Sequence, residues 1–382
     1  MKRLCGLVLV LVMVLGALPM RARAAELEIG GKSALLMELS TGKILYEKNA
    51  HEPLAPVSVT KVMTMLLIME AIDGGSIGWN DTVTASEAAA AKGGSQIYLK
   101  VGESMTVSDM VKSIAVSSAN DCACAMAEHI AGSEVAFVER MNQRAKELGM
   151  NDTHFVNCTG LDDDPNAKEH LTSAHDIALM SRELMLHHPD IRKFTTIWMD
   201  TVRNGEFGLS NTNKLVRFYP GATGLKTGFT SAAGYCLSAT AQRDGMELVA
   251  VVMGCETSQE RFSACKGMLD YGFATYAVIT PTLEEDASVP VVLGKQGKVN
   301  AVPGEAAPVL IEKAQKGSIT TTLTLEKQIP APVSKGQRLG TFTIQAGDQI
   351  LAQIPLVAEK AVKKKTFGDL FIEILKMAAM AK

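Results

Sequence analysis

The chain has 382 residues, 47% hydrophobic and 21% charged, which is enough material for a globular core and for more than one domain. Its formal net charge is -3, whereas binding to nucleic acid requires a basic surface, so we expect no nucleic-acid partner. The sequence contains no nucleotide-binding loop and no Cys/His spacing typical of a zinc site, so we expect neither a metal nor a cofactor.

Residues 1–24 have the pattern of an export signal. Lys2 and Arg3 precede an apolar run over residues 4–18, and Ala22-Arg23-Ala24 places small residues where a signal peptidase reads. The run is short for a membrane span, although a retained span is the alternative. We therefore expect a mature, exported protein that begins at Ala25.

Cleavage of this signal would remove Cys5 and leave six cysteines. An oxidising compartment permits disulfides, but a chain of this length does not need them as a framework, and their pairing cannot be deduced from spacing. We expect most of them to be small buried residues. The six are Cys122, Cys124, Cys158, Cys236, Cys255 and Cys265.

Residues 25–276 mix strand and helix patterns. Ser33–Leu39 and Ile44–Glu47 predict a hairpin, and residues 62–72 are apolar nearly all round, which predicts a helix in the middle of a domain. Strand patterns return on both sides of Arg243-Asp244-Gly245, a strong signal for a tight turn. We expect one sheet built from remote pieces around a helical middle. The other helical patterns cover residues 85–91, 105–114, 123–131, 135–148 and 173–185, and the late strand patterns cover 234–241 and 246–254.

Residues 277–358 change to short apolar runs separated by turn residues, which predicts a small all-β domain. Residues 359–382 then place four lysines before a helix with one apolar face, and we interpret this segment as an anchor at a membrane surface. Docking on the β domain, or pairing with another subunit, is the alternative. The β runs are 289–293, 320–325, 340–345 and 349–355, the lysines are Lys360, Lys363, Lys364 and Lys365, and the apolar face is Phe367, Leu370, Phe371, Ile374, Leu375, Ala378 and Ala381.

The first chemical motif is Ser58-Val59-Thr60-Lys61. Residues three apart on a helix share one face, so the lysine can reach the serine hydroxyl. A serine is a poor nucleophile without a base, and burial in an apolar helix lowers the pKa of a lysine enough for it to act as one. The motif alone is weak, because most such pairs lie on solvated helix faces.

Two further motifs follow in order. Ser118-Ala119-Asn120 precedes a helix that begins near Asp121, so its side chains are able to point into a cleft, although helix capping is their commonest use. Lys226-Thr227-Gly228 precedes the predicted hairpin, which suggests an edge strand where glycine permits close approach of a ligand. An exposed turn is the alternative. The three motifs together predict an active-site serine enzyme.

With these motifs and the flanking strings Pro56–Thr64, Thr159–Asp162 and Thr223–Gly228, the chain resembles the low-molecular-mass penicillin-binding proteins, which are serine D-alanyl-D-alanine carboxypeptidases of peptidase family S11. The resemblance implies an α/β (α+β) transpeptidase-like domain with an antiparallel sheet flanked by helices in two or three layers. A small all-β domain and a terminal membrane-anchor helix follow. It implies peptidoglycan stem peptides as substrates, β-lactams as inhibitors and a place on the outer face of the cell membrane.

The resemblance also implies roles for individual residues. Ser58 would attack the penultimate D-alanine carbonyl while Lys61 takes its proton, and water would release the acyl group. Ser118 would relay a proton to the leaving amine. The backbone N–H groups of Ser58 and Phe229 would form the oxyanion hole. The substrate-binding residues would be Asn120 for the amide, Lys226 and Thr227 for the terminal carboxylate, and Gly228 and Phe229 beside them. Arg261 would add a further charge, with an ordinary surface arginine as the alternative.

Two other functions stay open on the sequence. A β-lactamase shares the fold and motifs, but Glu183, the candidate deacylating glutamate, comes 65 residues after Ser118 (183 minus 118), too late for that class. An inactive wall-binding scaffold would not need three intact motifs. Thr212 and Thr223 depart from some family members, which leaves substrate preference open. None of the seven histidines is interpreted as catalytic.

Overall fold

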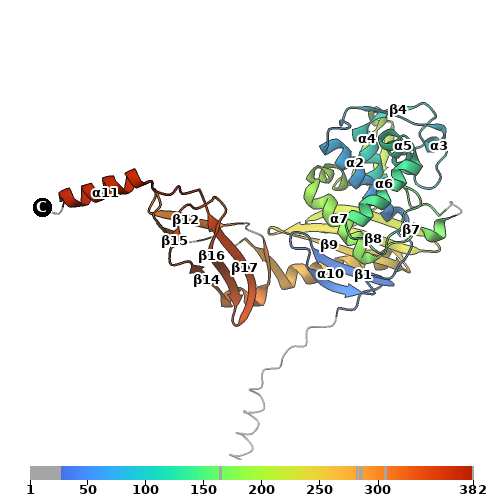
Figure 1. The fold of residues 1–382 in the computed structure, drawn as a ribbon. Coiled ribbons are helices and arrows are strands. Elements are labelled where there is room, and N and C mark those ends of the chain that lie inside the picture. The colour runs from blue at the N-terminus through green and yellow to red at the C-terminus, as the bar shows by residue number, and fades with distance from the viewer. Residues whose placement is uncertain (1–26, 163–165, 281–282, 284–286, 305–307, 381–382) are drawn as a thin grey trace, which may run out of the picture.

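The structure is a computed structural model that describes residues 27–380 apart from 163–165, 281–282, 284–286 and 305–307. The predicted signal segment, residues 1–24, lies outside the described residues. Figure 1 shows a larger body of helices and sheet, a smaller body of strands and a projecting C-terminal helix.

The larger body contains a five-stranded antiparallel sheet with the strand order β2-β1-β9-β8-β7. The N-terminal hairpin joins strands that come about 200 residues later, as predicted, because β1 pairs with β9 from Ser33↔Met253 to Glu38↔Leu248. Asp244 and Gly245 form the predicted two-residue turn, both with positive φ. The strands are β1 Ser33–Glu38, β2 Ile44–Lys48, β7 Ala222–Thr230, β8 Gly234–Arg243 and β9 Met246–Cys255.

Helices cover both faces of this sheet and give three layers (Figure 1). Helix α10 packs on one face with its own apolar core, and α7 covers the other face, with α2 and its neighbours beyond it. Sequence patterns located α2, α4, α5, α6 and α7 within a few residues, but they missed α10, the longest helix described, and two short strand pairs. The helices are α2 Lys61–Asp73, α3 Glu87–Ala90, α4 Val107–Ser117, α5 Asn120–Ala131, α6 Glu134–Glu147, α7 Ala174–His187, α8 Arg192–Thr195, α9 Leu215–Phe218 and α10 Ser258–Thr275, and the strand pairs are β3 Thr82–Thr84 with β4 Ser104–Thr106 and β5 Met199–Val202 with β6 Phe207–Ser210.

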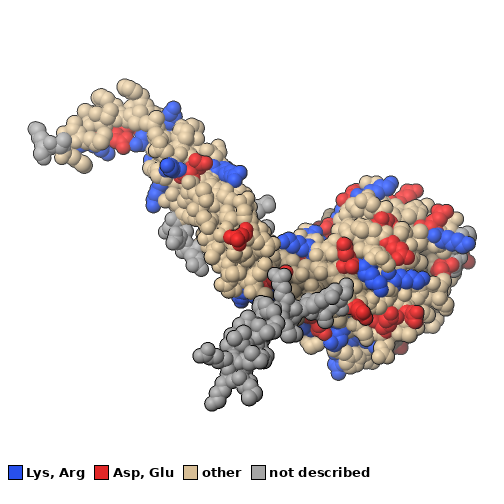
Figure 2. Space-filling model, turned by 90° about the horizontal axis from the view of Figure 1, so that it is seen from below, with Lys and Arg blue, Asp and Glu red and all other residues tan. Residues whose placement is uncertain are grey.

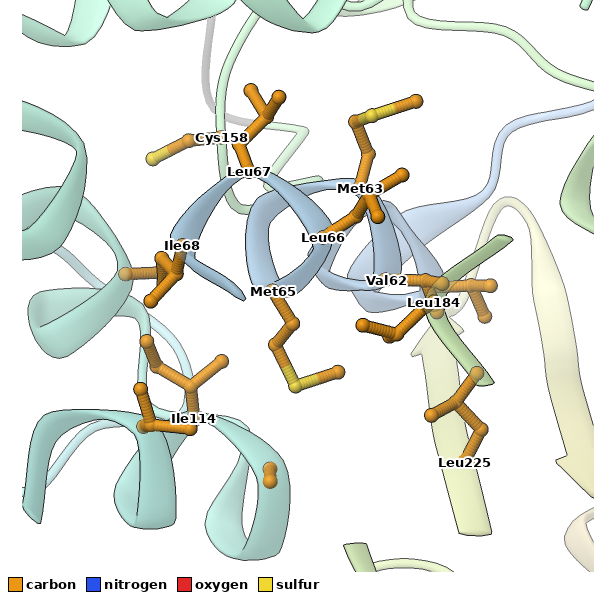
Figure 3. Close-up of a cluster of buried hydrophobic side chains, with 14 of the residues drawn as sticks. Val62, Met63, Met65, Leu66, Leu67, Ile68, Ile114, Cys158, Leu184 and Leu225 are labelled. Carbon is orange, nitrogen blue, oxygen red and sulfur yellow. The ribbon is translucent and has the colours of Figure 1, made fainter. Parts of the chain in front are cut away.

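Helix α2 lies in the middle of the helical layer, as its uniform apolar sequence predicts. Its first nine residues, Lys61 to Met69, are all buried. In Figure 3 its side chains point outward in several directions, toward neighbours that include Ile114 of α4, Leu184 of α7 and Leu225 of β7. The central position of α2 therefore depends on both the helices and the sheet around it.

The smaller body is all β apart from one 3-10 turn among its described residues. Its sheet has the order β14-β16-β17-β12-β11-β15, a two-stranded ribbon of β10 and β13 lies beside it, and the body has its own apolar core. The four predicted runs correspond to β11, β14, β16 and β17. The strands are β10 Tyr276–Ile279, β11 Ser288–Val292, β12 Lys298–Pro303, β13 Val309–Glu312, β14 Ile319–Leu325, β15 Ile329–Pro330, β16 Arg338–Ala346 and β17 Gln349–Ala358.

The predicted C-terminal helix is present as α11, Phe367–Met380, and it projects from the far end of the smaller body (Figure 1). Its apolar side chains are exposed, for example Phe367, Phe371 and Ile374. The lysine-rich segment before it is held to the β body by bridges at Val362 and Lys364. Lysine and arginine side chains gather around this junction (Figure 2). Among the described residues, no helix has the length and hydropathy needed to cross a bilayer.

The central position of α2 yields a stability prediction. Leu66→Ala should lower the free energy of unfolding of the larger body by about 2–5 kcal/mol, because Leu66 is fully buried and its loss leaves a cavity. Val135→Ala on α6 should cost less than about 0.5 kcal/mol, because Val135 is 71% exposed. Tryptophan fluorescence in urea measures both, since Trp79 and Trp198 both lie in the larger body. Equal losses would contradict the packing described here.

Candidate active site

Ser58 lies on a short 3-10 turn, Val57–Thr60, that leads directly into α2. The expectation of one continuous helix over Ser58 and Lys61 is therefore wrong in detail, because the α-helix begins only at Lys61. The contact nevertheless forms, since residues three apart are eclipsed in a 3-10 turn. Lys61 Nζ lies 3.1 Å from Ser58 Oγ.

Lys61 is fully buried at the start of α2. Its Nζ donates a hydrogen bond to the carbonyl of Thr159 at 2.8 Å. Burial lowers the pKa of Lys61 from 10.5 to about 7, while charge at Cys158 and Asp121 acts in the opposite direction. The site therefore contains an amine that is neutral in a substantial fraction of molecules near neutral pH and that contacts a serine hydroxyl.

Ser118 and Asn120 lie at the junction between α4 and α5. Ser118 ends α4 with a left-handed backbone, φ 65°, and Asn120 is the first residue of α5. The capping alternative is wrong for Asn120, because Ala119 occupies the N-cap and no side chain caps this helix. Ser118 Oγ and Asn120 Oδ1 are buried without a hydrogen-bond partner in the described part of the chain. Both atoms therefore have free hydrogen-bonding capacity at the junction between α4 and α5.

The amide of Asn120 is held from the other side. Its Nδ2 donates to the carbonyl of Gly93 at 2.7 Å, and its backbone N–H donates to the carbonyl of Ser95 at 2.7 Å. The sequence did not reveal the role of Asp121, whose buried carboxylate accepts the N–H groups of Ile97 and Leu99. Together these bonds fix the loop from 93 to 99 against the start of α5.

The Lys226-Thr227-Gly228 motif lies on β7, which is an edge strand as predicted. Lys226 is buried, and burial together with repulsion from Lys61 and Arg261 lowers its pKa well below the ordinary value. A Cβ atom at Gly228 would lie 2.3 Å from Val57 Cγ2 and 3.2 Å from Ser58 N, so only glycine allows β7 to approach the nucleophile turn.

Residues near Lys226 on β7 make contacts of different kinds. Thr227 Oγ1 donates a hydrogen bond to Thr212 Oγ1 at 2.6 Å. Thr212, the position where some family members have arginine, therefore contacts the motif directly. Phe229 is half exposed, and its ring stacks on Tyr235 with centroids 4.1 Å apart. Thr223, the other departure, bonds to Glu247 and Thr240 within the sheet instead.

Arg261 is not an ordinary surface arginine, so that alternative is wrong. It is only 8% exposed on α10, on the opposite side of the sheet from α2. Its Nη1 donates to the carbonyl of Gly228 at 3.0 Å and to that of Cys236 at 3.4 Å. Its guanidinium therefore supports the backbone of the motif from behind.

A loop between α6 and α7 completes the surroundings of Lys61. Asn157 Oδ1 accepts the N–H groups of Thr159 and Gly160, which fixes the carbonyl that Lys61 contacts. A Cβ atom at Gly160 would lie 1.9 Å from the carbonyl oxygen of Val57, so this glycine also allows a close approach. In the sequence, this loop was marked only by the string Thr159–Asp162, which supported the family resemblance but indicated no role for these residues.

A pocket of about 320 Å³ opens beside the nucleophile turn. Its walls are mainly apolar, with Lys32, Asp162 and Lys168 at charged positions. His170 contributes to the wall and lies 2.8 Å from Thr60 Oγ1, a contact that ties the turn to the loop before α7. Glu183 is held by Arg144 at 2.6 Å, which accounts for it as part of an ion-pair network.

Comparisons with known proteins match both bodies. The family model described as D-alanyl-D-alanine carboxypeptidase, peptidase S11, matches residues 20–257, and that of the C-terminal domain of penicillin-binding protein 5 matches residues 280–364. D-alanyl-D-alanine carboxypeptidase DacF of Bacillus subtilis is 43% identical over 379 residues and covers 96% of each chain. DacC of Escherichia coli is 33% identical, over 89% of this chain and 86% of its own.

Solved structures agree with this result. Penicillin-binding protein 5 from Haemophilus influenzae superposes with a TM-score of 0.78 at 29% identity, over 89% of this chain and all of that one. Penicillin-binding protein D2 from Listeria monocytogenes, in an ampicillin-bound form, has a TM-score of 0.57 at 30% identity, over 65% of this chain and 99% of that one. The chain belongs to the S11 family of serine-type D-alanyl-D-alanine carboxypeptidases, the low-molecular-mass penicillin-binding proteins that act on peptidoglycan.

Proposed function

We propose that Ser58 is the nucleophile and Lys61 its general base in removing the terminal D-alanine from peptidoglycan pentapeptide stems. The observation that carries this proposal is the 3.1 Å contact between Ser58 Oγ and Lys61 Nζ, with the pKa of Lys61 lowered to about 7 by burial. The serine oxygen bonds to the carbonyl carbon of the penultimate residue, and its proton passes to Lys61. The C–N bond then breaks, D-alanine leaves, and water hydrolyses the acyl-enzyme.

Ser118 carries a proton between Lys61 and the leaving amine, and Asn120 binds the substrate amide. The buried, unpartnered Ser118 Oγ and Asn120 Oδ1 support these roles. The bond from Asn120 Nδ2 to Gly93 leaves the oxygen as the atom that faces a ligand, so it would accept a substrate N–H.

The backbone N–H groups of Ser58 and Phe229 form the oxyanion hole in this proposal. The tight approach of Gly228 to Ser58 N supports it, because it brings β7 beside the nucleophile turn. Lys226 and Thr227 bind the terminal carboxylate of the substrate. Arg261 adds positive charge. It also donates a hydrogen bond to the carbonyl of Gly228, and so positions the strand that carries Lys226 and Thr227.

We also propose that the protein is exported and attached to the outer face of the cell membrane through α11. The exposed apolar side chains of α11 and the basic residues at its base support attachment to an anionic lipid surface. In this proposal residues 25–276 form the catalytic domain, 277–358 the β domain and 359–382 the basic linker and anchor.

A first test combines two substrates. Wild-type protein should form a covalent adduct with labelled penicillin and release D-alanine from a pentapeptide ending in D-Ala-D-Ala. Ser58→Ala should lose both activities, turnover falling by at least about 10⁴-fold because the nucleophile is absent. Ser210→Ala is the matched control, since Ser210 is an exposed serine on β6. Mass spectrometry and a D-alanine assay give the readouts.

Two outcomes of this test would reject the proposal. Rapid hydrolysis of penicillin without release of D-alanine would identify a β-lactamase. Wild-type protein that forms no adduct and releases no D-alanine would leave an inactive wall-binding scaffold.

The lowered pKa of Lys61 yields a pH prediction. The neutral amine accepts the serine proton, so the acylation rate should rise as pH rises through about 7 and level off above it. Lys61→Arg should remove the activity, because a guanidinium stays protonated over this range. Stopped-flow measurement with a fluorescent penicillin between about pH 5 and pH 9 checks the profile. A flat wild-type profile would contradict Lys61 as the base.

The anchor proposal is tested on vesicles. The protein without its signal should sediment with anionic vesicles and much less with neutral ones, and Phe371→Asp should weaken binding by at least about tenfold because it places a charge on the apolar face. Glu373→Asp keeps the charge at a position off that face and is the control. If Phe371→Asp binds as well as Glu373→Asp, α11 does not insert its apolar face.

A further inference from the structure

Two cysteines from separate segments meet behind the candidate active site. Cys124 lies on α5, Cys158 lies in the loop between α6 and α7, and both are fully buried. Both contact one carboxylate, that of Glu134 at the start of α6. Cys158 Sγ lies 3.2 Å from Glu134 Oε1, and Cys124 Sγ lies 3.8 Å from Glu134 Oε2. The two thiols are therefore neighbours in space although 34 residues separate them (158 minus 124).

Cys124 also affects the protonation of Cys158. A hydrogen bond with Cys124, followed by burial, raises the pKa of the Cys158 thiol well above its ordinary value. The negative charge of Glu134 is balanced by Lys92 rather than by the thiols, because Lys92 Nζ lies 2.6 Å from the carboxylate. Glu134 Oε1 also accepts the backbone N–H of Cys158 at 3.2 Å. Loss of both thiol hydrogens would leave Glu134 with these two partners.

The pair lies next to the groups that hold Lys61. The carbonyl of Cys158 accepts a hydrogen bond from Thr64 Oγ1 at 2.6 Å, and the next carbonyl, that of Thr159, accepts from Lys61 Nζ at 2.8 Å. Cys124 lies one turn after Asn120 on the same helix. A covalent bond between the two sulfurs would therefore join the helix that carries Asn120 to the loop that positions Lys61.

We propose that Cys124 and Cys158 are a disulfide site, oxidised after export. The step is thiol–disulfide exchange with a small-molecule disulfide or an oxidoreductase disulfide. One S–S bond forms between the two cysteines, their two protons and two electrons pass to the oxidant, and the oxidant's S–S bond breaks to give two thiols. An extracytoplasmic compartment supplies such oxidants.

Burial decides when the bond forms. Both thiols are fully buried in the folded protein, so exchange with a folded, reduced molecule is slow. Oxidation takes place while the chain folds, before α5 and the loop close over the sulfurs. The same burial then protects the finished bond from reductants.

The other described cysteines have different surroundings. Cys122, two residues from Cys124 on the same helix, is fully buried. Cys236 and Cys255 belong to cores on opposite faces of the sheet, which keeps their side chains apart. Cys265 Sγ lies 3.5 Å from the carbonyl oxygen of Ala250. Cys122 is therefore a matched control, as a buried cysteine on the same helix.

The test refolds the reduced mature chain with oxidised glutathione or with reduced glutathione, followed by alkylation and tryptic digestion without reduction. The oxidised sample should contain residues 113–140 linked to residues 147–168, two hydrogens lighter than the separate peptides. Cys122→Ala should keep this link, while Cys124→Ala and Cys158→Ala should lose it. The oxidised wild type should melt roughly 5–10 °C above the reduced form, and Cys124→Ala should show no such difference.

Three results would overturn the proposal. The first is complete alkylation of Cys124 and Cys158 after oxidative refolding of protein that binds penicillin. The second is a link that survives in Cys124→Ala and disappears in Cys122→Ala. The third is an equal shift in melting temperature for wild type and Cys124→Ala. The link is read by mass, so the result is independent of carboxypeptidase activity. If Cys158→Ala fails to fold, Cys124→Ala still decides between these outcomes.

Discussion

An ammonium group loses its hydration when it is buried, which lowers the pKa of the amine. The catalytic arrangement around Ser58 depends on this effect at Lys61. Lys61 Nζ contacts a hydroxyl and a carbonyl, neither of which carries a charge, so burial favours the neutral amine. That burial requires α2 to be enclosed on all sides. The helices, the loop with Thr159 and the sheet provide the enclosure, and the three-layer architecture therefore maintains the chemistry as well as the stability of the protein.

Enclosing α2 also brings together parts of the site that are remote in sequence. The turn before α2, the junction between α4 and α5, and strand β7 all pack around the same helix. Two glycines make this possible, because Gly160 and Gly228 each lie where a Cβ would overlap Val57. Val57 itself has φ 46°, which is unusual for a β-branched residue and marks the turn as locally strained.

The sequence predicted local elements well because periodicity and turn chemistry are local. The apolar character of α2, the Asp244-Gly245 turn and the edge position of β7 could all be read from it, and the order of three motifs indicated the site. Contacts between elements could not be read. The burial of Arg261 behind β7 and the meeting of Cys124 with Cys158 arise only when separate segments pack, so no pattern within one segment reports them.

The pairing order of the sheet has a consequence for the rate of folding. Strand β1 lies between β2 and β9, and Ser33 pairs with Met253, 220 residues later (253 minus 33). The N-terminal hairpin therefore cannot join the sheet until nearly the whole larger body has been synthesised. Contacts of such high sequence separation slow folding, since a long loop must close before they form. The central sheet of the larger body is therefore completed only after β8 and β9, its last strands in the sequence, have been synthesised.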